Sequence, residues 1–447
     1  MKIAWFTPLS KKSAIARASA GIVTELAKLA DVNLIHFENG DVRDASVPVK
    51  RFASAAAVDE RTLNHYDLAI YNFGNHLPFH REIFLVSRRH PGICILHDFV
   101  MHHFFAAYYF EDQRNPAAYS LLMERLYGEE GTAAAQRVLS GRGPRLWETD
   151  EVVRFPLFEE VIRGAAGVVA HSGFLKKHVE ACFAGPVRRI SLPYDADRSA
   201  PHLSRGDLGL EDHQVLIVTV GHVNPNKRIE AVIDALGRLG PATGRVVYAI
   251  LGPCSPEYQE ALNAAVRRNH LERVVRFLGQ VPDDVLHAYL SHAGICINLR
   301  YPVTEGASAS VIEEMLFGKP VIVTDTGFYS ELMDGSVIKI HPERESELHI
   351  DLARLLEDQA LRENVGAAAR FYAESEFRAD RYAREILDFA WEVRRASPLL
   401  GLADRVAVEC NRMGMAASMK TVEAVAHEMS ALFTGEALGR DTHRTRR

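Results

Sequence analysis

The chain has 447 residues, of which 47% are hydrophobic and 25% are charged, and its formal net charge at pH 7 is −6. A chain of this length exceeds what one ordinary hydrophobic core holds, so we expect two or three domains. The composition is typical of a globular protein, and the acidic balance argues against a protein that binds nucleic acid or lies on an anionic membrane.

The first half of the sequence predicts a series of buried strands. They fall in residues 2–6, 31–37, 66–75, 92–99 and 165–172, with helical or polar segments between them. These apolar runs lack the alternation of a half-buried strand, a pattern typical of strands covered on both faces of a parallel sheet.

Two segments interrupt this pattern. Residues 101–160 carry no strand signal and are rich in Ala, Leu, Tyr and Arg, so we expect a helical insertion there. Residues 195–213 are charged, contain Gly and Pro and show no periodicity. This second segment is the best candidate for a linker.

A second alternating series follows the linker. Strands are predicted within residues 214–221, 245–252, 274–281, 294–299 and 320–325, again with helical patterns between them. After residue 375 the sequence turns helical, first over 380–396 and again over 416–433.

Repeated strand–helix units on both sides of a linker predict an α/β fold with two facing, Rossmann-like, doubly wound domains and a C-terminal helical extension. We expect one domain at 1–195, a second at 213–380, and helices with a short basic tail at 381–447. Ligands bind beyond the carboxyl ends of the strands in such sheets, which indicates a site in the cleft between the domains.

The stretch "RYPVTEGASASVIEEMLFGKPVIVTDTG" at residues 300–327 holds two carboxylates eight positions apart, Glu305 and Glu313. Between them, the small residues Gly306, Ala307 and Ser308 open a predicted helix, where free backbone N–H groups and the helix dipole favour a phosphate. The carboxylates would then accept hydrogen bonds from ligand hydroxyl groups on either side of a diphosphate. Spacing alone leaves open that both are solvated surface residues.

A basic loop follows the first strand of the second half. The stretch "VGHVNPNKRIEAVIDAL" places Gly221, His222, Lys227 and Arg228 there. A lysine at this position would act as a point charge on a diphosphate. A surface lysine is the alternative interpretation.

Three segments in order, "G-x5-KR-x2-AVIDAL", "VRFLGQVPDD" and "EGASASVIEEMLFGKPVIVTDTG", resemble the retaining glycosyltransferases of family 4, which have the GT-B fold. The resemblance runs from Gly221 to Gly327. A weaker one covers "ICILHDF", "VVAHSGFLKKHV" and "ISLPYDAD" in the first half.

The resemblance implies a role for each matching residue. Glu305 and Glu313 fall on the family's E-x7-E motif, so Glu305 would contact hydroxyls of the donor sugar and Glu313 the ribose hydroxyls. Lys227 would hold the diphosphate, the backbone of Val281 would meet the base, and His97 would lie near the transferred sugar. The first domain would bind the acceptor, and the C-terminal helices would cross back to it.

Two positions depart from the family pattern. His222 stands where the family has arginine, so a permanent charge on the diphosphate is missing, and Arg228 or Arg300 are candidates to replace it. Ala14 stands in the run Ser13-Ala14-Ile15-Ala16, where the family has a glycine. Its methyl group narrows the approach of the donor phosphate or the acceptor.

No metal site and no cofactor are expected. The histidines and Asp98 in "LHDFVMHH" lack further ligands at metal spacing. Asp195 and Asp197 form a D-x-D at the linker, which we interpret as a domain boundary. No G-x-G-x-x-G fingerprint follows any strand, which argues against a dinucleotide enzyme.

The sequence therefore predicts a retaining, metal-independent, hexosyltransferase-like enzyme of bacterial glycan, glycolipid or glycoconjugate synthesis. Its donor would be a UDP-, GDP- or dTDP-sugar. Its acceptor stays open among glycan, lipid-linked, protein and small-molecule classes. A non-catalytic binding or scaffold protein and a sugar-nucleotide epimerase on the same fold are the alternatives.

The expected location is the cytoplasm. The five cysteines are odd in number and irregularly spaced, which indicates reduced thiols, and no apolar run suits a signal peptide or a membrane span. At most a peripheral membrane contact is expected, and the C-terminal helices offer a surface for self-association.

Overall fold

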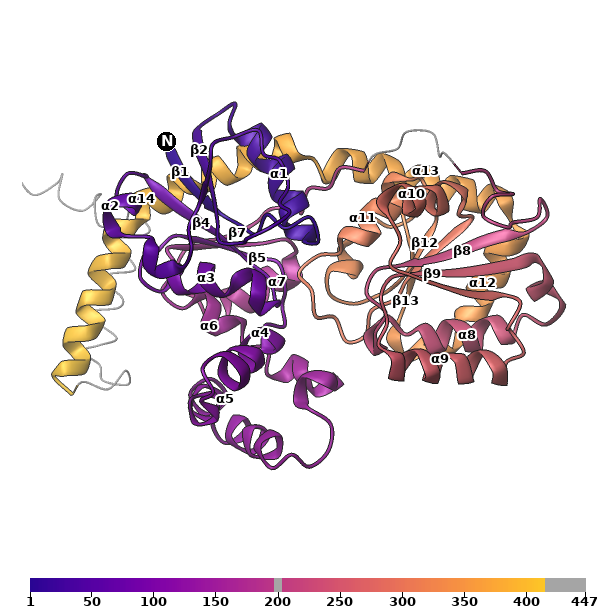
Figure 1. Ribbon diagram of the computed structural model, residues 1–447, viewed down its shortest axis with the longest axis horizontal. Coiled ribbons are helices and arrows are strands. Elements are labelled where there is room, and N and C mark those ends of the chain that lie inside the picture. The colour runs from indigo at the N-terminus through magenta and orange to yellow at the C-terminus, as the bar shows by residue number, and fades with distance from the viewer. Residues whose placement is uncertain (197–202, 415–447) are drawn as a thin grey trace, which may run out of the picture.

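The computed structural model describes residues 1–196 and 203–414, which form two lobes side by side (Figure 1). We call them the N-terminal lobe and the C-terminal lobe. Each is built on its own parallel sheet, so the predicted pair of facing α/β sheets is confirmed. The predicted helix at 416–433 and the basic tail lie outside the described residues.

The N-terminal sheet has seven strands in the order β3-β2-β1-β4-β5-β6-β7. Its strands are β1 (Lys2–Phe6), β2 (Asp31–His36), β3 (Val49–Arg51), β4 (Leu68–Phe73), β5 (Ile93–Leu96), β6 (Gly167–Ala170) and β7 (Val187–Arg189). β4, β5 and β6 are buried at every position, as expected for strands covered on both faces. The exposed edge strand β3 and the edge strand β7 were not predicted.

The C-terminal sheet has six strands in the order β10-β9-β8-β11-β12-β13. They are β8 (Val215–Val220), β9 (Val246–Leu251), β10 (Val275–Gly279), β11 (Ile295–Asn298), β12 (Val321–Thr324) and β13 (Ile338–Ile340). Five of the six strands coincide with predicted runs, and the sequence analysis missed β13. In each sheet the strand order reverses beside the first strand of the lobe, which is β1 in one sheet and β8 in the other. Ligands of open α/β sheets bind at such a reversal.

Helices cover both sheets. Those of the N-terminal lobe are α1 (Ala14–Leu26), α2 (Glu60–Leu63), α3 (Leu77–Ser87) and α7 (Gly173–Glu180). Those of the C-terminal lobe are α8 (Ile229–Gly237), α9 (Pro256–Arg268), α10 (Asp283–His292), α11 (Ala309–Leu316), α12 (Leu348–Glu357) and α13 (Gln359–Glu376).

The insertion between β5 and β6 is helical, as the sequence indicates. It contains α4 (His102–Ala107), α5 (Pro116–Leu139) and α6 (Phe158–Ile162), and α5 projects away from the N-terminal sheet (Figure 1). The backbone of α5 is interrupted at Gly128, where φ is 59°. A positive φ is accessible to glycine at little cost, so this residue permits the kink.

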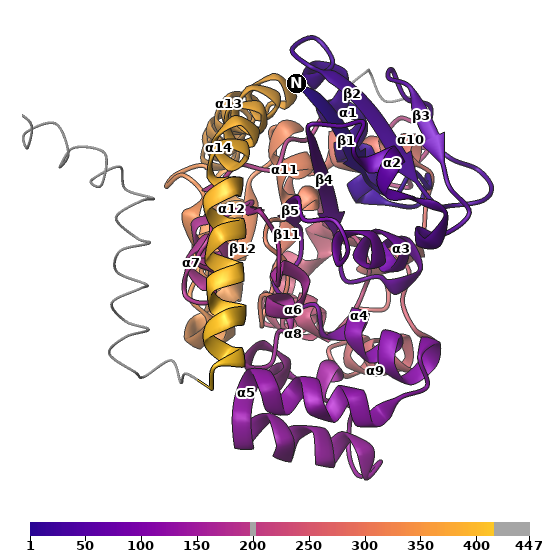
Figure 2. The same cartoon turned by 90° about the vertical axis from the view of Figure 1, so that its left-hand side faces the viewer.

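The last described helix, α14 (Ala379–Arg412), leaves the C-terminal lobe and runs along the N-terminal lobe (Figures 1 and 2). Tyr382, Ile386 and Phe389 on this helix are buried in the same apolar cluster as Ile3 and Trp5 of β1. The chain thus crosses back between its lobes. No helix in the described part of the chain is both long and apolar enough to cross a membrane.

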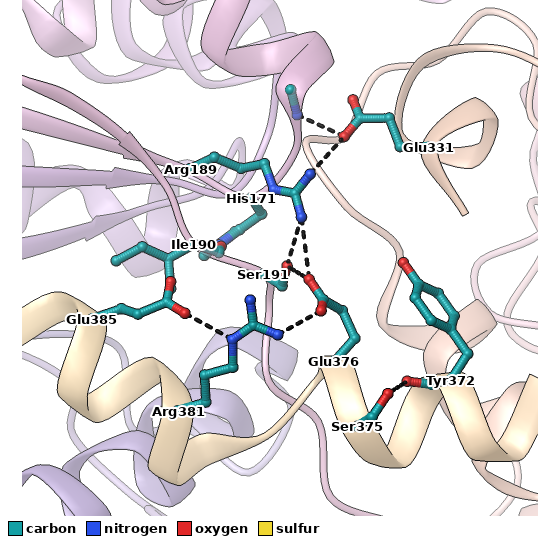
Figure 3. A network of polar contacts seen from close by, with 11 residues as sticks. His171, Arg189, Ile190, Ser191, Glu331, Tyr372, Ser375, Glu376, Arg381 and Glu385 are labelled. Atoms are coloured by element: carbon teal, nitrogen blue, oxygen red, sulfur yellow. Dashed lines mark hydrogen bonds and ion pairs between the residues drawn. The ribbon is translucent and has the colours of Figure 1, made fainter. Parts of the chain in front are cut away.

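A polar network joins the lobes near the crossing (Figure 3). Arg189, at the end of β7, reaches two carboxylates of the C-terminal lobe: its NH2 lies 3.1 Å from Glu376 and its NH1 lies 3.7 Å from Glu331. Glu331 in turn accepts hydrogen bonds from the backbone N–H groups of Gly173 and Phe174, at 2.7 and 2.5 Å. Glu331 therefore caps the start of α7 from the opposite lobe.

Candidate active site

The loops after β5 and β11 touch across the cleft between the lobes. The backbone N–H of Val100 donates to Thr304 at 2.9 Å, and that of Gly306 donates to His97 at 2.8 Å. A methyl group on Gly306 would lie 2.6 Å from Cδ2 of Leu175 and 3.0 Å from the carbonyl oxygen of His97. Only glycine therefore lets the two loops come this close. We expected the Gly306 N–H to bind the donor, but it donates to His97 of the other lobe.

Glu305 lies in this contact, and both of its carboxylate oxygens have partners. Nε of Arg300 lies 3.0 Å from Oε1, the Tyr329 hydroxyl donates to the same oxygen, and the Thr304 hydroxyl donates to Oε2 at 3.1 Å. Burial acts to raise the pKa of Glu305, but Arg300 and the Tyr329 hydroxyl outweigh it, so the pKa is lowered. The side chain is an ionised carboxylate held in one orientation.

Lys227 ends a short 3-10 turn after β8, and its side chain is only 3% exposed. Its ammonium group donates to the carbonyl oxygen of Val220. Burial and the charge of Arg300 lower its pKa, against the opposing effect of Glu314 and Glu305. Lys227, Arg300 and Glu305 thus belong to one buried group of charges at the carboxyl edge of the C-terminal sheet.

Glu314 completes this group, although the sequence analysis gave it no role. Nδ2 of Asn298 donates to both of its oxygens, at 3.0 and 3.1 Å. Burial raises the pKa of Glu314 to about 8, even though Lys227 acts to lower it.

Glu313 faces the opposite lobe and is 3% exposed. Nε2 of His287 lies 3.1 Å from its Oε1, and NH1 of Arg17 lies 3.8 Å from the same oxygen. Arg17 also donates to the Tyr194 hydroxyl at 2.9 Å and lies 3.6 Å from Asp283. Arg17 belongs to α1, so the carboxylate predicted to hold the ribose is engaged by a cation of the N-terminal lobe.

A cavity of about 280 Å³ lies where the two lobes meet. The start of α11 contributes Ala307 and Ala309 to its wall. The N-terminal lobe contributes the remaining walls, which are lined by Lys12, Ser13, Ala14, Ile15, Ala18, Gly74, Asn75, His76, Phe79, His80, His97, Asp98, Leu192 and Tyr194. Ala14, which departs from the family pattern, is thus part of the cavity wall.

His97 is held in a defined tautomer beside this cavity. The amide nitrogen of Asn72 donates to the carbonyl oxygen of Phe6 at 3.0 Å, so its oxygen faces Nε2 of His97, also at 3.0 Å. Nε2 therefore carries the proton. Burial, His171 and His80 lower the pKa of His97 well below its usual value, so the imidazole is neutral near pH 7.

The other predicted residues lie in different surroundings. Ser308 caps α11, because its hydroxyl accepts from the Val311 N–H. Val281 follows β10 at the carboxyl edge of the sheet. Burial and Lys227 lower the pKa of His222. Arg228 makes a bidentate pair with Glu345 at 2.8 and 2.6 Å, so its charge is already neutralised.

Within residues 1–196 and 203–414, no group of three or more His, Cys, Asp or Glu side chains is arranged to hold a metal ion.

The residues that the sequence analysis missed come from distant segments: Arg17, Tyr194, Asn298, Glu314 and Tyr329. Tyr329 is 24 positions from Glu305, and Arg17 is 177 positions from Tyr194. Glu314 was visible beside Glu313, but only the fold shows that both sides of this helix are buried.

Residues 203–371 match the family of glycosyl transferases group 1. This segment is a group 1 glycosyltransferase domain. The matched segment holds Lys227, Arg300, Glu305 and Glu313, so it covers the charged edge of the C-terminal sheet. No curated protein sequence matches the chain significantly.

Solved structures share the arrangement of the glycosyltransferase's two lobes. Anabaena HepE, solved in complex with UDP and glucose, has 18% identity and a TM-score of 0.60 over 87% of this chain and 99% of that one. The sucrose-phosphate synthase of Thermosynechococcus elongatus has 16% identity and a TM-score of 0.62 over 89% and 100%. WaaG, a glycosyltransferase involved in lipopolysaccharide biosynthesis, has 16% identity and a TM-score of 0.56 over 87% and 99%. The predicted GT-B fold is confirmed.

Proposed function

We propose that this glycosyltransferase moves a hexose from UDP-hexose to an acceptor hydroxyl, with retention of configuration and without a metal ion. The observation that carries the proposal is the group formed by Lys227, Arg300 and Glu305, which lies beside a cavity shared by both lobes. UDP is preferred to GDP and dTDP because HepE was solved with UDP and with UDP-glucose.

Lys227 and the start of α11 would bind the diphosphate. The ammonium group supplies a compact positive charge, and the first backbone N–H groups of α11 add the positive end of the helix dipole. Ala307 and Ser308 are small enough to let a phosphate approach these N–H groups. Positive charge at a fixed position stabilises the leaving diphosphate as the glycosidic bond breaks, which is the main demand of the reaction.

Glu305 would accept hydrogen bonds from hydroxyls of the donor sugar. Its oxygens are already fixed by Arg300, Tyr329 and Thr304, which suits a hydrogen-bonding anchor better than a free nucleophile. Double displacement in retaining hydrolases needs two carboxylates about 5–5.5 Å apart around the sugar, and Glu313 is assigned elsewhere. We therefore propose a front-face reaction, in which an oxygen of the leaving phosphate takes the acceptor proton.

Glu313 would hold the ribose hydroxyls, and the backbone at Val281 would meet the base. Neutral His97, with its Nε2 proton directed to Asn72, would present Nδ1 as an acceptor near the transferred sugar. His222 is neutral as well, so the positive charge at the diphosphate would come from Lys227, with the guanidinium groups of Arg17 and Arg300 nearby.

The N-terminal lobe would bind the acceptor. We propose the cytoplasm as the location of the protein. The five cysteines are free thiols in the structure, as a reducing compartment requires.

The test is a transfer assay with UDP-, GDP- and dTDP-glucose. Glu305→Ala is expected to abolish transfer and leave UDP binding largely intact, because the nucleotide contacts lie elsewhere. Glu160→Ala is the matched control, since this carboxylate is likewise buried and held by arginine, here Arg125 and Arg163, but lies in the helical insertion. Full transfer by Glu305→Ala would contradict the assigned role.

A further inference from the structure

The cavity wall of the N-terminal lobe holds a buried histidine that the donor site does not use. His80 lies on α3 and is 1% exposed. Its Nδ1 lies 3.0 Å from the carbonyl oxygen of Asn72, and a carbonyl oxygen only accepts, so Nδ1 carries the proton. Nε2 of the neutral ring is therefore a hydrogen-bond acceptor.

No described residue donates to Nε2 of His80, although His80 lines the cavity. Nε2 is thus accessible from the cavity, where an N–H or O–H group of a ligand can donate to it. Burial lowers the pKa of His80 to about 4, so the ring stays neutral and keeps this acceptor at neutral pH.

Asp98 faces the same point. A methyl group on Gly74 would lie 3.0 Å from Nε2 of His80 and 3.2 Å from Oδ2 of Asp98. Nε2 of His80 and Oδ2 of Asp98 therefore lie close to the same glycine, on the wall of the same cavity. Oδ2 is oriented by the Asn75 N–H at 2.8 Å, and Asp98 itself forms a backbone bridge to Glu305 of the other lobe.

The rest of the cavity suits a small ring. Phe79 lines it, and the ring of His76 packs on Phe79 with centroids 4.6 Å apart. Aromatic surface packs well against the C–H face of a sugar, while the hydroxyls of the ring need polar partners at its edge. A volume of about 280 Å³ is at the small end for ligand pockets, which favours a single ring.

We propose that His80 and Asp98 form an acceptor subsite over Gly74, and that this subsite takes a hydroxyl group of a pyranose ring. This hydroxyl donates to Nε2 of His80, and a neighbouring hydroxyl of the same ring donates to a carboxyl oxygen of Asp98. The inference rests on the proposed function and adds the acceptor class to it: the acceptor presents a sugar ring next to the donor.

The test uses methyl α-D-glucopyranoside, titrated by saturation-transfer NMR with and without UDP. His80→Asn keeps an amide N–H near the Nδ1 position for Asn72 and removes the Nε2 acceptor. We expect the glucoside to bind this variant about tenfold more weakly, which is the effect of losing one net hydrogen bond. The affinity for UDP, measured by calorimetry, is expected to be unchanged.

His102→Asn is the matched control. His102 is also buried with a pKa lowered to about 4 by burial, and its Nδ1 donates to the Phe155 carbonyl at 2.7 Å. Its Nε2, however, is paired with the Tyr119 hydroxyl at 2.9 Å, and it does not line the cavity. This variant is expected to lose stability but to bind the glucoside as the wild type does.

Gly74→Ala provides a second test that leaves both polar side chains in place. Its methyl group lies against both of them, at 3.0 and 3.2 Å, and needs a shift of the end of the Ile15 side chain, 2.6 Å away, and a small adjustment of the two polar side chains. We expect loss of glucoside binding with UDP binding retained. Equal glucoside affinity in wild type, His80→Asn and Gly74→Ala would overturn the subsite.

A wild-type protein that binds UDP but not the glucoside would overturn the pyranose class and leave the donor site intact. Failure to bind UDP would instead contradict the proposed function. The titration without UDP still decides the subsite in that case.

Discussion

Arg17 of α1 and Glu313 of α11 meet across the cleft, with NH1 of Arg17 3.8 Å from Oε1 of Glu313. The guanidinium is also held by the Tyr194 hydroxyl at 2.9 Å. Burial acts to lower the pKa of Arg17, but Tyr194, Glu313 and Asp283 raise it, so the charge is permanent. A ribose at Glu313 has to share the carboxylate with this cation.

Arg17→Ala is expected to weaken UDP binding about tenfold. The cleft holds several carboxylates and UDP adds two phosphates, so removing the Arg17 cation leaves more negative charge unneutralised when UDP is bound. The expected loss corresponds to one charged hydrogen bond, which contributes about 1.5–3 kcal/mol. Arg17→Lys retains the charge and should recover part of the affinity. Calorimetry of UDP binding measures both, and tighter binding by Arg17→Ala would show that Arg17 competes with the nucleotide.

His222→Arg is expected to tighten UDP binding severalfold. Burial and the nearby Lys227 lower the pKa of His222, so the native side chain adds no charge at pH 7, whereas arginine adds a permanent one. His213→Arg serves as the control, because His213 lies in the linker beside Glu211, at 3.4 Å. An equal gain from both substitutions would indicate a general charge effect and contradict a diphosphate at position 222.

Glu331→Ala tests the link between the lobes shown in Figure 3. The substitution leaves the N-cap Ser172 but removes the acceptor of the Gly173 and Phe174 N–H groups, which costs about 1–2 kcal/mol of stability, and separates Arg189 from one of its two carboxylates. We expect a lower midpoint in urea and faster amide exchange at the start of α7. Unchanged exchange of the Gly173 and Phe174 amides would contradict the capping role.

The buried histidine His102 is expected to make the free energy of unfolding depend on pH. Burial lowers the pKa of His102 from 6.5 to about 4, so in that interval the unfolded chain binds a proton that the folded chain does not. The stability contributed by His102 is therefore present above pH 6.5 and is lost as the pH falls toward 4. This loss amounts to roughly 3 kcal/mol at full extent.

Urea unfolding of the wild type and His102→Asn at several pH values measures this effect. The variant is expected to be less stable at pH 7, and the difference should shrink as the pH falls. A constant difference across the range would show that His102 titrates normally.

The fold was largely predictable because the central strands are buried on both faces and stand out as continuous apolar runs. The strands β3, β7 and β13 were missed for the opposite reason: each is three residues long and carries charged residues, as in Val49–Arg51. A short edge strand owes its pairing to its neighbour in the sheet, which local sequence does not reveal.

The site was predictable only in part. Glu305, Glu313 and Lys227 follow from a linear motif, and the structure brings their segments to one edge of the C-terminal sheet. Arg228 was predicted to bind the donor because it follows Lys227 in the sequence. Its backbone is left-handed, with φ of 56°, and its side chain pairs with Glu345, 117 positions away. Such long-range pairing, like that of Arg17 and Glu313, depends on how the lobes pack.

The central claim is that Lys227 and the two glutamates form a nucleotide-sugar site. Calorimetric titration of UDP into the wild type and Lys227→Met tests it most directly. Methionine fills a similar volume without a buried charge, so the variant should fold, yet its UDP affinity should fall at least about tenfold, the loss of one charged hydrogen bond. A folded variant that binds UDP as tightly as the wild type would contradict the account.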